Sequence, residues 1–173
     1  MKKLYKILKV SAYVIGSLVI VVSVLFGYQD IPLDDLKEKY AKYLLNEIED
    51  KCIVFCNTQL QADRICKDSY HSSNPDAEEN LLRFKNDDID QLSCVLQLNE
   101  GINIPNLRAG IIMHAYGNER KSNQRIGRLL RLNPDDTAII HILCYKGTVD
   151  ERWVTEALKD LDSSKITFHD VET

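Results

Sequence analysis

The pattern of apolar and polar positions divides the chain into two regions that predict different structures. Residues 10–29 contain no charged side chain. A helix of about 20 residues reaches about 30 Å, which is enough to cross the hydrocarbon core of a bilayer. From residue 50 onward, short continuous apolar runs alternate with stretches in which apolar residues recur every three or four positions. The continuous runs are typical of strands buried on both faces of a parallel sheet, and the periodic stretches predict amphipathic helices.

Strands are therefore expected at residues 52–56, 93–98, 109–113 and 137–144, with a further short strand within 163–173. Helices are expected at residues 36–49, 77–85, 120–132 and 149–161, and another should follow the first strand to about residue 68. Asn57 or Thr58 can cap that helix, because a side-chain oxygen there accepts a backbone N–H of the first turn. In the last helix, Trp153, Leu158 and Leu161 should face the core. Strands that alternate with helices predict an α/β fold with a parallel sheet covered on both faces.

The apolar N-terminal stretch predicts a single transmembrane helix. Four lysines precede it and three aspartates follow it within six residues, which predicts that the N-terminus is inside. A cleaved secretory signal is the alternative, but the run is long for one and no Ala-x-Ala site precedes Asp30. The expected divisions are a basic start and membrane anchor at 1–29, an amphipathic connecting helix at 30–49, a globular lobe at 50–165 and a tail at 166–173. The expected location is a membrane, or the cytoplasm if the anchor is not used.

Composition narrows the functional classes. The 173 residues are 45% hydrophobic, enough for one ordinary core, and the net charge is −4. A chain of this charge is not a generally basic nucleic-acid binder, so phosphate binding would need a local patch. Five cysteines without a Cys-x-x-Cys pair predict buried reduced thiols, with no zinc site and no disulfide framework. His71 has no nearby partner in the sequence and is expected to be a loop residue.

Positive charge gathers on one face of the helix expected across residues 120–132. At 100° per residue, the polar side chains of this face lie within about 60° of one line: Arg120, Lys121, Gln124, Arg128 and Arg131. Apolar side chains occupy the opposite side. A guanidinium keeps its charge and offers a planar fork of donors, which suits a polyphosphate. The alternative is the solvated face of an ordinary amphipathic helix.

Three segments resemble motifs of superfamily-2 helicases of the DEAD/DEAH and restriction-enzyme-like kind. Residues 51–58 (KCIVFCNT) resemble motif IV, residues 100–105 (EGINIP) resemble motif V, and residues 124–131 (QRIGRLLR) resemble motif VI. Together they cover about residues 50–165 in the order and spacing of the second helicase lobe. The resemblance implies a RecA-like fold and the second lobe of an ATP-dependent nucleic-acid helicase.

In this family ATP lies between two lobes, and motif VI of the second lobe directs arginines at the γ-phosphate held by the first. The resemblance implies that Arg128 and Arg131 are the catalytic, finger-type arginines, which stabilise the charge of the phosphoryl transition state. Gln124 and Arg125 would make supporting contacts to the nucleotide.

The resemblance implies two further contact regions. Gly101 and Asn103 would line the nucleotide or couple it to nucleic acid. Asn103 departs from the family, where an aspartate is commoner, and the amide loses the charge that would pair with a motif VI arginine. Asn57 and Thr58 would contact a nucleic-acid phosphate at the strand-to-helix turn, where backbone amides and the helix dipole favour an anion.

The elements that hold the nucleotide in a first lobe do not occur in these 173 residues. There is no Gly-x-x-x-x-Gly-Lys-[Ser/Thr] segment and no Asp-Glu-x-[Asp/His] segment. ATP and Mg²⁺ would therefore depend on a first helicase lobe supplied in trans, and this chain is not expected to hydrolyse ATP by itself. The other expected partners are single-stranded nucleic acid and a lipid bilayer, which residues 10–29 would contact.

Residues 1–41 are similar to the leader of membrane-anchored α/β-hydrolase proteins, but no Gly-x-Ser-x-Gly nucleophile elbow occurs in the chain. Three hypotheses therefore remain open. The chain is an incomplete second helicase lobe, or a membrane-anchored interaction module that keeps the fold without the chemistry. The third possibility is a mosaic of an unrelated anchor and a helicase fragment.

Overall fold

The computed structural model describes residues 6–8, 18–25, 33–95, 104–114, 137–159 and 162–172. These residues form one eight-stranded sheet of order β1-β8-β2-β7-β6-β3-β5-β4, in which β1 is antiparallel to β8 and the other pairs are parallel. The strands are β1 Lys6–Leu8, β2 Leu18–Leu25, β3 Cys52–Cys56, β4 Ser69–Tyr70, β5 Gln91–Val95, β6 Ala109–Ile112, β7 Ala138–Tyr145 and β8 Ile166–Glu172. The helices are α1 Leu33–Glu47, α2 Gln59–Ile65, α3 Ala77–Lys85 and α5 Val149–Leu158, with a 3-10 turn at Ser163–Lys165.

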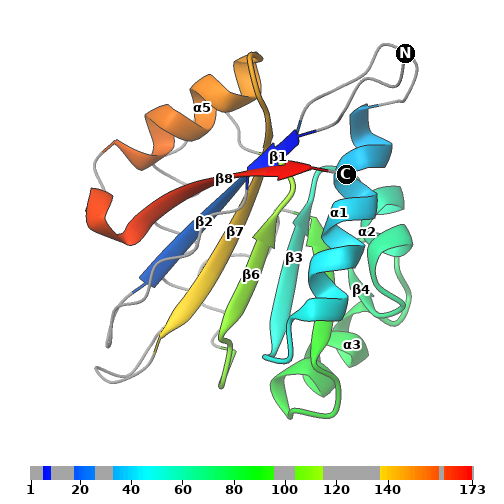
Figure 1. The fold of residues 1–173 in the computed structure, drawn as a ribbon. Helices are drawn as coiled ribbons and strands as arrows, with labels where there is room; N and C mark the ends of the chain where they lie inside the picture. Colours follow the sequence, from blue (N-terminus) through cyan, green and yellow to red (C-terminus); the bar gives the residue numbers. More distant parts are fainter. Residues whose placement is uncertain are drawn as a thin grey trace.

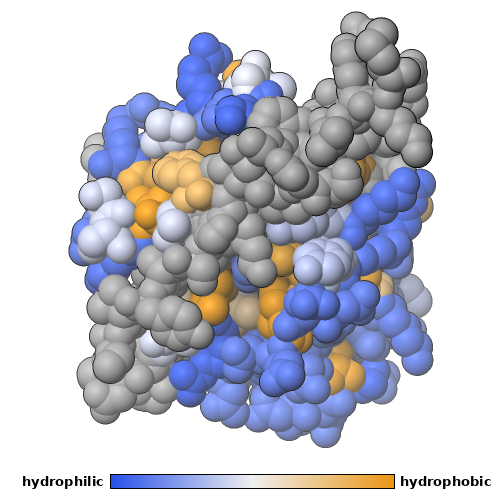
Figure 2. Space-filling model, viewed as in Figure 1, coloured by the Kyte–Doolittle hydropathy of each residue, from blue (hydrophilic) through white to orange (hydrophobic). Residues whose placement is uncertain are grey.

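Two layers of apolar side chains pack on the two faces of the sheet. On one face, α1 and α2 cover alternate residues of β3, such as Cys52 and Val54. On the other face, Ile53 and Phe55 of the same strand belong to a cluster that includes Leu81 and Phe84 of α3 and, over β7, Val154 and Leu158 of α5. Figure 1 shows α5 beside β7 and the other three helices around β3 and β4. In Figure 2 the surface in that second region is mostly hydrophilic, as expected for helices whose apolar side faces a sheet. The predicted RecA-like α/β architecture, with a parallel sheet covered on both faces, is confirmed.

Most predicted elements of the globular part occur close to their predicted positions. The bounds of β3 and α3 are those that the sequence predicted, and α1, β6, β7 and α5 differ by a few residues at their ends. One side chain differs from expectation. Trp153 is half-buried, because Val154 and Leu158 fill the contact between α5 and the sheet.

The predicted transmembrane helix is wrong for residues 18–25, which form β2. This strand pairs in parallel with β7 along its whole length, from Leu18 beside Ala138 to Leu25 beside Tyr145, and its other edge pairs with β8. Valine and isoleucine dominate the segment, and β-branched side chains fit a strand that has neighbours on both edges. Among the described residues, no helix is long and apolar enough to span a bilayer. Residues 10–17 and 26–29 of the predicted span lie outside the described residues, and the membrane location and orientation stay predictions.

Candidate functional site at the carboxyl ends of the strands

The carboxyl ends of β3, β6 and β7 lie side by side, because these strands are neighbours in the parallel part of the sheet. Ligands of open α/β sheets bind at this edge. Asn57 and Thr58 follow β3, Met113 and His114 follow β6, and Tyr145 ends β7. The described part of the candidate site is made of these strand ends and of the helices that begin there.

The turn between β3 and α2 is held by two local hydrogen bonds. Thr58 is the N-cap of α2, and its Oγ1 accepts the backbone N–H of Gln61 at 3.1 Å. The Gln61 side chain reaches back, and its Oε1 accepts the backbone N–H of Asn57 at 2.9 Å. Gln61 is buried, whereas Asn57 and Thr58 are exposed. The predicted capping role therefore falls to Thr58, and the turn presents two polar side chains to solvent in a fixed conformation.

A buried lysine connects the ends of β6 and β7. The ammonium of Lys37, on α1, donates to the carbonyl oxygen of Met113 at 2.8 Å and to Asp150 Oδ2 at 2.5 Å. It also lies 4.9 Å from the centre of the Tyr145 ring. Asp150 Oδ2 accepts the backbone N–H of Tyr145 at 3.1 Å as well. The Lys37 side chain is 1% exposed, so the charge is balanced inside the protein by this carboxylate, carbonyl and ring.

The turn from β7 into α5 is closed by side-chain hydrogen bonds. Thr148 is the N-cap, and its hydroxyl donates to the carbonyl oxygen of Tyr145 at 2.7 Å. Gly147 has φ of 73°, a left-handed conformation that glycine adopts without strain. Its N–H donates to Glu151 Oε2 at 2.7 Å. The turn thereby places the Asp150 carboxylate within hydrogen-bonding distance of the Lys37 ammonium.

The five cysteines are free and buried, as predicted. Burial is the main cause that raises the pKa of the Cys66 thiol to about 11 and that of the Cys144 thiol to about 12. It likewise raises the pKa of Cys52, Cys56 and Cys94. Neutral buried thiols are poor nucleophiles and poor metal ligands. Within the described residues, no group of three or more His, Cys, Asp or Glu side chains is placed to hold a metal ion.

Residues 35–133, more than half of the chain, match the helicase conserved C-terminal domain family. The chain belongs to this family. It is similar to the DNA 3'-5' translocase XPB2 of Sulfurisphaera tokodaii, with 31% identity over 121 residues, which are 66% of this chain and 27% of that protein. The chain thus spans about a quarter of that relative's length and corresponds to the C-terminal lobe of a superfamily-2 helicase.

Solved DEAD-box structures share the fold of this helicase lobe. The yeast splicing factor Prp28 matches with a TM-score of 0.63 and 18% identity, over 86% of this chain and 33% of that one. The E. coli protein SrmB matches with a TM-score of 0.59 and 15% identity, over 87% of this chain and 88% of that one. At these identities the likeness supports the architecture and no more.

All six residues of the predicted nucleotide site of the helicase lobe lie outside the described residues: Gly101, Asn103, Gln124, Arg125, Arg128 and Arg131. The structure does place the last residues of motif V, Ile104 and Pro105. The carbonyl oxygen of Pro105 accepts a hydrogen bond from Lys51 Nζ at 3.1 Å, beside the amino end of β3. Pro105 therefore lies at the edge of the sheet opposite the candidate site.

The Lys37 contacts were missed by the sequence analysis. A lysine in an amphipathic helix is expected to be solvated, and Asp150 looks like an ordinary first-turn acid. The two residues are 113 positions apart, so no local pattern could connect them.

Proposed function

We propose that this helicase lobe binds single-stranded nucleic acid and completes an ATP site whose other half belongs to a first lobe supplied in trans. The family match over residues 35–133 carries this proposal. The geometry supports it, since the Thr58 turn and the ends of β6 and β7 lie along one edge of the sheet.

The nucleic-acid contact is assigned to the turn after β3. Asn57 and Thr58 are exposed there, and the buried Gln61 fixes the turn through hydrogen bonds with the Asn57 N–H and the Thr58 hydroxyl. A rigid turn of this kind can donate to a phosphate oxygen from a hydroxyl and an amide without ordering a flexible loop. Contact through phosphates predicts an affinity that falls as the salt concentration rises and that does not depend on base sequence.

The nucleotide contact is assigned to motif VI. Arg128 and Arg131 would approach the γ-phosphate, Gln124 and Arg125 would support them, and Gly101 and Asn103 would line the same site. The first lobe would hold ATP and its Mg²⁺, because these 173 residues contain no phosphate-binding loop of that kind. A finger arginine acts on the transition state and not on nucleotide affinity alone, so its loss should lower turnover more than binding.

The test uses the full chain with single-stranded RNA and DNA at low and high salt, with and without a separately expressed first lobe of a superfamily-2 helicase. We expect weak, salt-sensitive binding and no ATP hydrolysis by the chain without that lobe. With the lobe present, Arg128→Ala should lower the ATPase rate by a factor of about 10³. The matched control is Arg152→Ala, which removes an exposed arginine of α5.

Two outcomes would overturn the proposal. One is ATP hydrolysis by the purified chain that survives Arg128→Ala and Arg131→Ala. The other is the absence of nucleic-acid binding under every condition, which would favour an interaction module that keeps the fold without the chemistry.

A further inference from the structure

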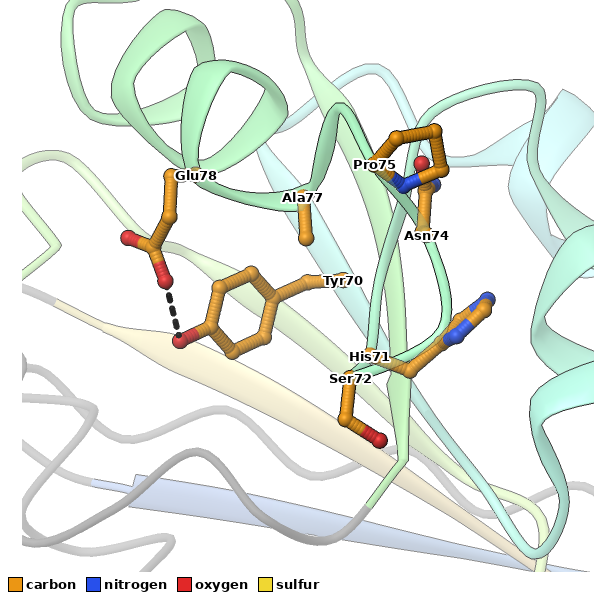
Figure 3. Close-up of a pocket in the computed structure, with 7 residues that line it drawn as sticks. All are labelled: Tyr70, His71, Ser72, Asn74, Pro75, Ala77 and Glu78. Atoms are coloured by element: carbon orange, nitrogen blue, oxygen red, sulfur yellow. Dashed lines mark hydrogen bonds between the residues drawn. The ribbon is translucent and has the colours of Figure 1, made fainter.

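A second candidate site lies beside β4, and none of its lining residues is assigned above to nucleotide or nucleic acid. A cavity of about 600 Å³ opens between the end of β4 and the first turn of α3. It is lined by Tyr70, His71, Ser72, Asn74, Pro75 and Glu78, among others. Figure 3 shows Glu78 reaching from α3 to the Tyr70 hydroxyl, with His71 and Ser72 on the other side of the Tyr70 ring. A cavity of this volume is in the range of pockets that hold small ligands or a few peptide residues.

One wall of the cavity combines an aromatic ring with a carboxylate. The Tyr70 hydroxyl donates to Glu78 Oε1 at 3.2 Å. Burial and the nearby Glu78 charge raise the pKa of Tyr70, so the phenol stays protonated and remains the donor. Glu78 is exposed and has a second oxygen to offer. A cation that entered here would meet both a negative charge and the face or edge of a ring.

A buried histidine lies on the other side of the cavity. His71 Nε2 lies 2.8 Å from Asp63 Oδ1, and the side chain is 5% exposed. Because a carboxylate accepts, the His71 Nε2–H is the donor of this contact. Nδ1 is buried and has no hydrogen-bond partner in the structure. Hydrogen bonds from His71 and then from Ser69 lower the pKa of Asp63, which keeps that carboxylate charged.

The charges around the cavity favour a cation over a phosphate. Asp76 precedes α3, and Glu78 and Glu79 occupy its first turn. Arg83, at the far end of α3, pairs with Asp68 at 2.8 Å and does not neutralise these acids. A nucleic-acid backbone would be repelled by three carboxylates at the end of one helix.

We propose that this pocket binds an arginine side chain presented by a partner protein. A guanidinium stacks on aromatic rings, pairs with carboxylates through its planar fork and offers five N–H donors. Those properties match the Tyr70 ring and the Glu78 carboxylate. A lysine would supply the charge without the fork and should bind less well. This site uses other side chains than the proposed nucleic-acid contact, although Gln59, next to Thr58, donates to the Ser72 hydroxyl at 3.0 Å.

The experiment titrates the full chain with a seven-residue peptide that carries one arginine between glycines and serines. The control peptide has citrulline, which has the same shape without the charge. We expect a Kd on the order of 1 mM for the arginine peptide, with NMR signals of Tyr70, His71 and Glu78 shifting on binding. The citrulline peptide should bind at least fivefold more weakly.

Two neighbouring glutamates give a matched pair of variants. Glu78→Gln removes the carboxylate that lines the cavity and should weaken binding of the arginine peptide at least fivefold. Glu79→Gln makes the same change in charge one residue along the helix, at a position that does not line the cavity, and should change binding less than twofold. Tyr70→Phe keeps the ring and frees Glu78 from its hydrogen bond, so binding should be unchanged or tighter.

Equal effects of the two glutamate variants, equal binding of the two peptides, or no binding at 10 mM peptide would each overturn the proposal. A single-stranded RNA that shifts the same NMR signals when the peptide does not would overturn it as well. Failure here leaves the proposed function intact, because Glu78→Gln is not expected to change nucleic-acid affinity measured at the turn after β3.

Discussion

Two buried lysines lie at opposite edges of the sheet, where the strands begin and where they end. Lys37 lies at the carboxyl ends of β6 and β7, as described above. Lys51 lies at the amino end of β3, where its ammonium contacts Asp87 Oδ1 at 2.5 Å and lies 4.8 Å from the centre of the Phe84 ring. Each lysine combines a carboxylate, a backbone carbonyl and an aromatic ring. A buried ammonium is tolerated because each of its partners replaces part of its lost hydration.

We expect Lys37→Met to lower the free energy of unfolding by on the order of 3 kcal/mol, because it leaves the largely buried Asp150 carboxylate and the Met113 carbonyl without their donor. Urea denaturation gives the value. Adding Asp150→Asn should recover part of the loss, since the uncompensated charge is removed. Lys42→Met on the exposed side of α1 is the control and should have little effect. Equal losses for the two lysine variants would refute the assignment.

The pair of Asp63 and His71 predicts a pH-dependent contribution to stability. The pKa of Asp63 is lowered, first by the hydrogen bond from His71 and second by that from Ser69. A carboxyl group with a lowered pKa in the folded state stabilises the protein above its unfolded pKa, about 3.9, and the effect is lost as pH falls through the folded value. Asp63→Asn should therefore cost stability at pH 6 and progressively less as pH falls from 5 to 3. Urea denaturation across that range gives the difference in free energy of unfolding between the wild-type protein and Asp63→Asn. A difference that does not change with pH would show that the pair contributes nothing.

Two glycines should respond oppositely to alanine. A Cβ on Gly110, in β6, would meet its nearest atoms at 3.8 Å or more, which is ordinary contact, so Gly110→Ala should raise the free energy of unfolding by about 0.5 kcal/mol. Gly147 has φ of 73°, a conformation that is strained for alanine. Gly147→Ala should therefore lower the free energy of unfolding by about 1 kcal/mol, although no atom lies within 4 Å of the added Cβ. Thermal denaturation of both variants tests the pair, and the same sign for both would contradict it.

Among the helices and strands, those whose conformation is set by neighbouring residues could be predicted from the sequence. The run CIVFC is followed after one residue by the capping Thr58, so both the strand β3 and the start of α2 follow from neighbouring residues. For β2 the sequence predicts a helix. A continuous apolar run has no periodicity that distinguishes a strand from a helix, and the length of the run favours a helix. Its conformation is decided by pairing with β7 and β8, residues more than a hundred positions away.

The position of β2 makes a prediction that separates the strand from the membrane anchor. Deleting residues 1–32 would leave the edge of β7 open along eight residues, from Ala138 to Tyr145. We expect faster hydrogen exchange in β7 and a tendency to aggregate, because an open edge of an apolar strand pairs with other chains. Deleting residues 1–5 is the control, since it keeps β1 and β2. Unchanged exchange in β7 of the larger deletion would show that residues 18–25 do not complete the sheet.

At the scale of the whole molecule, the family and the architecture were predictable because three motifs and the alternation of elements each occupy a few neighbouring residues. The pocket beside β4 was not, since it depends on contacts between α2, β4 and α3 such as that of Asp63 with His71. The sequence predicts a loop at His71, as found, but gives no sign of a partner for its side chain. Its partner lies eight positions earlier, on a different element, and only the fold brings the two together.

The five thiols give the molecule a set of internal reporters. Cys52 and Cys56 lie on β3, Cys94 on β5 and Cys144 on β7, and Cys66 follows α2. A thiol that is buried and neutral reacts with an alkylating reagent when its part of the sheet opens. The rate at which each cysteine is modified therefore measures how often its own strand is exposed, without any engineered label. Peptide mapping after timed alkylation would give the order in which the layers of this lobe come apart.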